Sequence, residues 1–155
     1  VYSPDDALLA LNNPLIDIIQ VPFNILDRRL IDNNFFEIAK KKKKKVFIRS
    51  VYLQGLLIMN DEDIVKKKMS WAIPYLSSLR QFSKDNNIHI KSFALNAILE
   101  KVINSFIITG VENLGQLREN ISLLNNNLVS KNIYDDWWGN LPLLPEKLLN
   151  PSLWK

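Results

Sequence analysis

The segment Ile107–Asn120, IITGVENLGQLREN, carries residue types that can bind an anion. Its apolar run ends at Gly110, which permits a positive φ or a close backbone approach. Asn113 is a typical helix N-cap, and Gln116 three residues later completes the spacing of a capping box. Free N–H groups and the positive end of the helix dipole attract negative charge at such a turn. An ordinary strand-to-helix turn without a ligand needs the same cap, so the pattern alone leaves both interpretations open.

Strands and helices alternate along the chain. Apolar runs rich in β-branched residues predict strands at Ile16–Asn24, Val46–Leu57 and Ser105–Val111. Apolar residues at helical spacing predict a helix between the first two strands and further helices over Met69–Asp85, His89–Asn104 and Asn113–Asn126. This alternation is typical of βα units with a parallel sheet, so the fold class is α/β.

The two ends of the chain give further expectations. Val1 and Tyr2 resemble the end of a strand, and Ser3–Asp6 has the N-cap, proline and acidic residues of a helix start. The absence of an initiator methionine before Val1 suggests a fragment. The last segment, Asp135–Lys155, lacks clear periodicity, and we expect it to pack as an irregular cap.

The predicted sheet is too small to be a complete closed barrel. Three or four parallel strands in an open sheet would leave apolar edges unprotected. A (β/α)₈ TIM barrel has about 250 residues, and this chain has 155. We therefore expect the chain to be the C-terminal half of such a barrel.

The net charge of +4 comes from one run of six lysines, Lys40–Lys45. Without that run, 14 basic residues stand against 16 acidic ones. The run follows an apolar-faced helix, where cations complement the negative end of the helix dipole. A block of like charges is also a candidate surface for nucleic acid or anionic membrane, which gives the alternative of a non-catalytic basic interaction module.

Composition excludes several classes of protein. The chain has no cysteine, so it has neither a disulfide framework nor a thiolate metal site. No apolar run approaches the roughly 20 residues that span a bilayer, and no signal pattern precedes the first helix. His89 lies between two isoleucines and is expected to be structural, so we predict no metal site. These features favour a cytoplasmic protein that binds neither membrane nor nucleic acid.

Three segments resemble, in order, the second half of the aldo/keto reductase family. They are IQVPFNILDRR (Ile19–Arg29), FIRSVYLQGLL (Phe47–Leu57) and ITGVENLGQLREN (Ile108–Asn120). The ending KLLNPSLW (Lys147–Trp154) is similar to the tails of some bacterial members. The resemblance covers essentially all 155 residues and implies one partial domain, residues 1–155, that lacks the N-terminal half of the barrel.

The resemblance implies a cofactor, NADP or alternatively NAD, and a reaction that reduces aldehydes or ketones. The residues expected around the adenosine end of the cofactor are Gly110, Asn113, Gln116, Glu119 and Asn120. Many family members carry arginine in place of Gln116 and a Lys-Ser pair in place of Gly110 and Val111. Those basic groups hold the 2′-phosphate, so their absence leaves the choice between NADP and NAD open.

The resemblance assigns the rest of the cofactor to the first two strands. Gln20 matches the residue that binds the nicotinamide carboxamide, and Arg49 matches the planar side chain that stacks on the nicotinamide. The segment that wraps the pyrophosphate would include Ser50, Tyr52, Gln54 and Gly55. Judged from residue type alone, without the resemblance, Gln20 is better explained as a buried amide and Arg49 as an ordinary ion-pair partner.

The catalytic Tyr, Lys, Asp and His of the family have no counterparts in this chain. Reduction needs a proton donor of tuned pKa as well as a positioned hydride. We therefore expect the cofactor-binding portion of an enzyme for a small carbonyl substrate, inactive alone. Its partner would be the missing half-barrel or a second copy. A regulatory product that binds the cofactor without catalysis is a further alternative.

Overall fold

The computed structural model describes residues 1–102, 105–125 and 129–154. Its sheet has three strands, β1 (Ile18–Pro22), β2 (Lys45–Arg49) and β3 (Ser105–Ile107), in the order β1-β2-β3. Both neighbouring pairs are parallel, with Gln20 opposite Phe47 and Phe47 opposite Phe106. The predicted α/β fold with a parallel sheet is confirmed.

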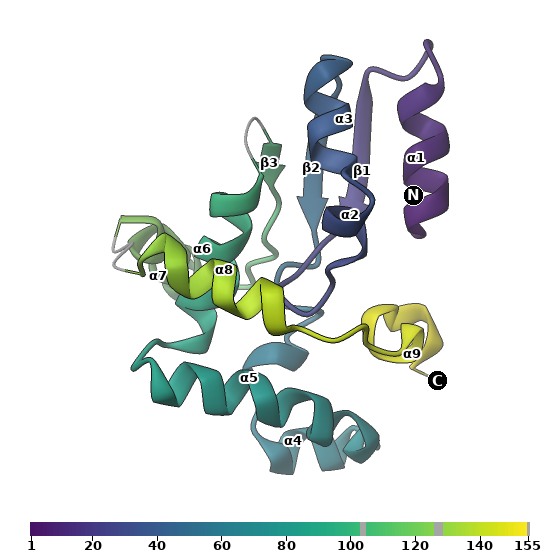
Figure 1. Cartoon of the computed structure of the whole chain (residues 1–155). Helices are drawn as coiled ribbons and strands as arrows, with labels where there is room; N and C mark the ends of the chain where they lie inside the picture. The colour runs from purple at the N-terminus through teal and green to yellow at the C-terminus, as the bar shows by residue number, and fades with distance from the viewer. Residues whose placement is uncertain (103–104, 126–128, 155) are drawn as a thin grey trace.

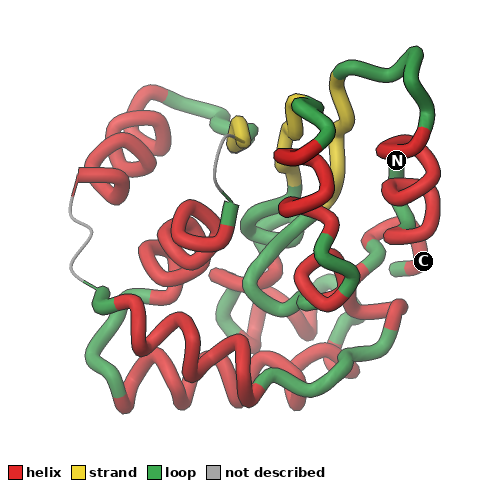
Figure 2. Tube along the Cα trace, turned by 45° about the horizontal axis from the view of Figure 1, so that its top comes forward, coloured by secondary structure: helices red, strands yellow, loops and turns green. Residues whose placement is uncertain are grey.

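Helices follow each strand, and α1 (Pro4–Asn12) and α3 (Phe35–Lys41) lie beside the sheet (Figures 1 and 2). The other α-helices are α2 (Arg29–Asp32), α4 (Asp61–Lys66), α5 (Ile73–Asp85), α6 (Ile90–Lys101), α7 (Leu114–Asn125), α8 (Lys131–Asn140) and α9 (Glu146–Leu149). Short 3₁₀ turns are η1 (Leu56–Ile58), η2 (Ser70–Ala72) and η3 (Pro151–Leu153). Among the described residues, no helix has the length and apolar character needed to cross a membrane. The predicted element ends at Asn104, Asn126 and Lys155 lie outside the described residues.

Alternation along the strands separates the sheet into a covered and an open face. Ile19, Val21, Val46 and Ile48 point to the covered face and are buried. The intervening residues point the other way, and Ile18 and Phe106 remain 56% and 52% exposed. Phe47 and Phe106 stack on this open face with ring centroids 4.8 Å apart. Helices α1 and α3 pack beside β1 and β2, whereas α7 lies at the opposite end of the molecule (Figure 1).

Several boundaries differ from the sequence prediction. The helix expected between the first two strands is divided into α2 and α3, because Asn34 adopts a left-handed conformation with φ of 53°. The strand expected over Val46–Leu57 ends at Arg49, because Ser50 also turns left-handed. Helix α4 was not predicted, although Asn60 caps it by accepting a 2.8 Å hydrogen bond from the Asp63 amide.

The C-terminal tail contains a real helix, so the expectation of an irregular cap is wrong for its first part. Tyr134, Trp137 and Trp138 share one face of α8 at the i, i+3, i+4 spacing, and all three are buried. The Trp137 indole donates a 2.8 Å hydrogen bond to the Ile25 carbonyl, and its ring contacts Phe82 and Phe93. The tryptophans therefore attach the tail to the loop that follows β1.

The lysine run lies where the dipole argument expects it. Lys40 and Lys41 form the last turn of α3, and Lys42 is its C-cap. Lys44 turns back and donates hydrogen bonds to the carbonyls of Asn13 and Ile16, beyond the C-terminus of α1. The six residues are therefore divided between a helix end, a turn and the start of β2.

Replacing Trp137 with alanine tests this attachment. The Trp137→Ala variant is expected to lose about 3–5 kcal/mol of unfolding free energy, because it opens a cavity and leaves the Ile25 carbonyl without its donor. Urea denaturation followed by circular dichroism measures the change. Leu143→Ala is the control, since Leu143 is 73% exposed. A Trp137→Ala loss as small as that of the control would contradict the packing described above.

Candidate functional site

A cleft of about 800 Å³ opens at the carboxyl ends of β2 and β3. One wall is the loop that follows β2, and the other is the segment that leads from β3 into α7. Eight of the eleven residues predicted to bind a cofactor line it: Ser50, Tyr52, Gln54, Gly55, Gly110, Gln116, Glu119 and Asn120. Residues that are distant in the sequence thus share one site because their strands are parallel neighbours.

The loop after β2 is held in a tight coil. Ser50, Leu53, Gln54 and Gly55 all have left-handed φ values, between 49° and 85°. The amides of Leu53 and Gly55 donate to the carbonyls of Ser50 and Tyr52 at 2.8 and 2.9 Å. Three non-glycine residues in this conformation are unusual and concentrate strain at the cleft. Buried Leu53 anchors the coil in the core, which leaves Tyr52 and Gln54 on the cleft wall.

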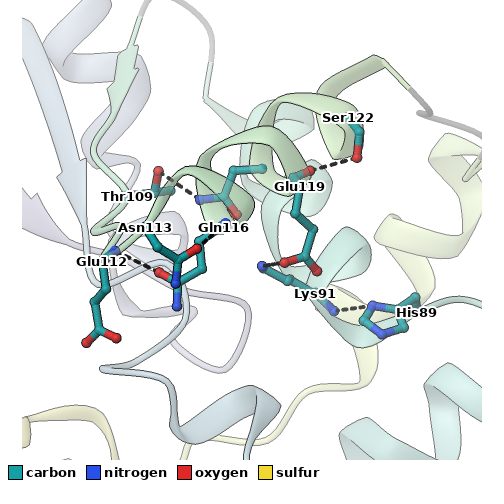
Figure 3. Close-up of polar contacts among 9 residues, drawn as sticks. His89, Lys91, Thr109, Glu112, Asn113, Gln116, Glu119 and Ser122 are labelled. Carbon is teal, nitrogen blue, oxygen red and sulfur yellow. Dashed lines mark hydrogen bonds and ion pairs between the residues drawn. The ribbon is translucent and has the colours of Figure 1, made fainter.

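The predicted cap of α7 is present. Asn113 accepts a 3.0 Å hydrogen bond from the Gln116 amide through its side-chain oxygen. The Gln116 side chain in turn accepts from the Glu112 amide at 2.8 Å (Figure 3). A standard capping box would direct this second bond to the Asn113 amide, so the box is displaced by one residue. The cap fixes the direction of α7, and its first-turn amides have no acceptor within the helix.

Gly110 acts differently from the sequence prediction. The β3 strand ends at Ile107, three residues earlier, and Gly110 does not adopt a positive φ. Among the described residues, no atom lies within 4 Å of the position that a Cβ would occupy. The glycine with a left-handed backbone in this cleft is Gly55, with φ of 85°. Gly110 therefore contributes open space to the cleft and is not required by the turn.

Lys91 was not predicted to belong to the site. It is the second residue of α6, is 8% exposed and lines the cleft. Its Nζ lies 2.5 Å from a Glu119 carboxylate oxygen and 5.8 Å from the centre of the Tyr52 ring. His89 is the N-cap of α6, and its Nδ1 accepts from the Lys91 amide at 3.3 Å (Figure 3). The available sequence signal was a lysine in the first turn of a helix, where the dipole disfavours a cation.

Two residues of the cleft lining carry a buried polar atom without a hydrogen-bond partner among the described residues: the Tyr52 hydroxyl and the Asn120 side-chain oxygen. Burial, with a further contribution from the Glu119 charge, raises the pKa of Tyr52 to about 12. The phenol therefore keeps its proton and can donate. Asn120 is 7% exposed, and its amide nitrogen lies 3.5 Å from the Thr109 hydroxyl. Unsatisfied buried groups of this kind are rare and fit a site completed by a ligand.

The three remaining predicted residues lie outside the cleft lining. Gln20 is exposed on the open face of β1, so it is not a buried amide in this chain. The Arg49 guanidinium lies 4.5 Å from the centre of the Tyr2 ring and donates to the Ser50 hydroxyl at 3.3 Å. Asn113 turns its side chain to the α7 backbone. Arg49 thus adjoins the cleft through Ser50, while Gln20 faces open space.

Comparisons with known proteins identify the family of this chain. A model of the aldo/keto reductase family matches residues 7–135, which is most of the chain, so the chain belongs to the aldo/keto reductase family. No curated protein matches the sequence.

Solved structures of aldo-keto reductases share the fold. One, AKR11C1 from Bacillus halodurans in its holo form, aligns with a TM-score of 0.65 at 17% identity, over 99% of this chain and 52% of that one. Another, the thermostable Tm1743 in complex with the inhibitor epalrestat, aligns with a TM-score of 0.54 at 19% identity, over 79% and 39%. This chain spans about half the length of these relatives or less.

Replacing Asn113 with alanine tests the cap. We expect the Asn113→Ala variant to lose about 1 kcal/mol of stability, because the Gln116 amide loses its acceptor. The loss should concentrate in α7, where hydrogen exchange of the backbone amides will accelerate. Asn113→Asp keeps an acceptor oxygen and should retain near-normal protection. Equal exchange in the alanine variant and the original chain would show that the cap does not hold the helix start.

Proposed function

We propose that this chain is the cofactor-binding, C-terminal part of a (β/α)₈ barrel enzyme, an NAD(P)H-dependent aldo/keto reductase acting on aldehydes or ketones. The observation that carries the proposal is the cleft, which is lined by eight of the residues that the family resemblance assigns to the cofactor, from two separate motifs. Membership of the aldo/keto reductase family supports the same conclusion. NADP is the proposed cofactor, with NAD as the alternative, because Gln116 stands where many relatives carry arginine.

The polar groups of the cleft fit a dinucleotide. The Asn120 oxygen is a buried acceptor that has no partner within the described part of the chain, which suits the amino group of an adenine. The first-turn amides of α7 and the positive end of its dipole suit a phosphate. The coiled loop of Ser50, Tyr52, Gln54 and Gly55 would wrap the pyrophosphate, and the space beside Gly110 would accept the adenosine end.

The nicotinamide end would lie toward the open sheet face. There Gln20 would bind the carboxamide, and the planar Arg49 side chain would stack on the ring. The bound cofactor supplies the hydride that reduces the carbonyl carbon. The proton must come from another part of the enzyme, since none of the tyrosines matches the family's donor. Tyr134, for instance, is buried in the core.

The exposed apolar surface of this chain supports the proposal that another half-barrel or a second copy packs against it. Strands β1 and β3 are the two edges of the sheet, and apolar residues of the open face are exposed beside them. Helix α7 adds an exposed apolar stripe of Leu114, Leu117, Ile121 and Leu124. Such surfaces and unpaired edges are usually covered in stable proteins. We infer that the N-terminal half of the barrel, or a second copy, covers them.

Replacing Gly110 with alanine tests cofactor binding. The new methyl group meets no atom of the described chain, so the stability of Gly110→Ala should stay unchanged. If the adenosine end approaches Gly110, the dissociation constant for NADPH should rise about tenfold, a loss of about 1.4 kcal/mol. NADPH and NADH fluorescence titrations measure both cofactors.

Gly139→Ala in α8 is the matched control, because its Cβ also meets open space away from the cleft. Its affinity for both nucleotides should equal that of the original chain. Equal affinities of the original chain, Gly110→Ala and Gly139→Ala would show that the cofactor does not approach Gly110. No binding of either nucleotide to the original chain would contradict the proposed function.

The isolated 155-residue chain should not reduce carbonyl compounds. It carries the proposed cofactor residues without the acid–base group, so the transition state lacks its proton donor. NADPH oxidation with small aldehydes and ketones measures turnover. A turnover number of about 1 per second or more, ordinary for an enzyme, would contradict the proposal that this chain is inactive alone.

A further inference from the structure

The charge balance of the cleft lacks an explanation in the proposed function. Among the described residues that line it, the acids are Glu112 and Glu119, and the groups able to carry positive charge are His89 and Lys91. The positions where many relatives hold the cofactor phosphate with basic side chains are Gly110, Val111 and Gln116. A phosphoryl ligand in this cleft would therefore find a positively charged partner in Lys91 of α6.

The location of Lys91 is costly for a residue with only a structural role. Its side chain is 11% exposed, and desolvation of an ammonium group is unfavourable. It also occupies the first turn of α6, where the helix dipole opposes a cation. The Glu119 carboxylate at 2.5 Å offsets part of this cost but is itself half exposed. One exposed carboxylate leaves the lysine free to exchange partners when an anion enters.

Tyr52 supplies a second donor on the same wall. Its hydroxyl is buried and has no partner among the described residues, and Tyr52 lines the same cleft as Lys91. The Lys91 Nζ lies 5.8 Å from the centre of its ring. The ammonium group thus lies over the ring of Tyr52, and the two residues give the cleft two donors of the kind that suits phosphoryl oxygens. A phosphoryl group bound by both residues would accept a hydrogen bond from the Tyr52 hydroxyl and would give Lys91 a second anionic partner.

We propose that the Lys91 ammonium and the Tyr52 hydroxyl form a phosphoryl-binding subsite of the cleft, with Glu119 as the competing partner that holds Lys91 before the ligand binds. The inference rests on the proposed function for its natural ligand, a dinucleotide. The subsite itself is defined by the chemistry of a phosphoryl group. It replaces the basic side chains that this chain lacks at Gly110, Val111 and Gln116.

The test measures binding of inorganic pyrophosphate, NADH and NADPH to the 155-residue chain by calorimetry. Lys91→Met should weaken pyrophosphate binding about ten- to a hundredfold, the value of a lost charged hydrogen bond. Tyr52→Phe should weaken it less, about three- to tenfold. Glu119→Gln should strengthen it about two- to fivefold, because Lys91 loses its competing partner.

Controls separate binding from folding. Lys91→Met exchanges a buried charge for an apolar chain of similar length, so its melting temperature should not fall. Lys91→Arg keeps the charge and should retain most of the affinity. Lys101→Met removes a cation from the other end of α6, where Lys101 pairs with Asp135 at 2.8 Å, and should leave pyrophosphate binding unchanged.

The nucleotides identify the phosphoryl group. Equal losses for NADH and NADPH in Lys91→Met indicate the pyrophosphate, whereas a loss confined to NADPH indicates the 2′-phosphate. If Lys91→Met is folded and binds all three probes like the original chain, the subsite is wrong and the proposed cofactor function stands. If neither nucleotide binds the original chain, the proposed function fails. In that case a pyrophosphate affinity that depends on Lys91 still supports the subsite, and its absence overturns the subsite too.

Discussion

The parallel pairing of β2 with β3 is the constraint on which the candidate site depends. Hydrogen bonding between parallel strands brings their carboxyl ends to the same edge of the sheet, although a long crossover separates them in the sequence. The register that places Phe47 opposite Phe106 therefore also brings the Ser50–Gly55 loop to the turn before α7. Helix α6, which lies within that crossover, presents Lys91 to the same space.

Side-chain alternation along the paired strands leaves one face of the sheet open. Alternation commits every second side chain of a strand to one face, and helices of the βα units cover only that face here. The opposite face retains Ile18, Phe106 and Ile108 with substantial exposure. A core on one face and an uncovered apolar surface on the other is the expected condition of part of a layered fold.

The parts that follow from local rules were predictable. Apolar periodicity found the three strands and most helices, and residue type found the caps at Ser3 and Asn113. The errors arise where tertiary structure decides: Ser50 turns left-handed, and α8 forms around buried aromatics that looked aperiodic. For the site, the resemblance to a family selected residues that share the cleft. It missed Lys91, because a lysine becomes informative only when its burial and its neighbours are known.

The burial of Lys91 and its proposed binding of an anion require different surroundings. A buried ammonium needs a nearby carboxylate to fold, yet an ammonium fully neutralised by a carboxylate attracts no anion. The cleft meets both demands through unequal burial, since Lys91 is nearly enclosed while Glu119 is half exposed. When the pair separates, water can solvate the half-exposed Glu119 carboxylate, so its charge does not remain buried without a partner. The arrangement allows a chain without basic side chains at positions 110, 111 and 116 to keep a positive charge in its cleft.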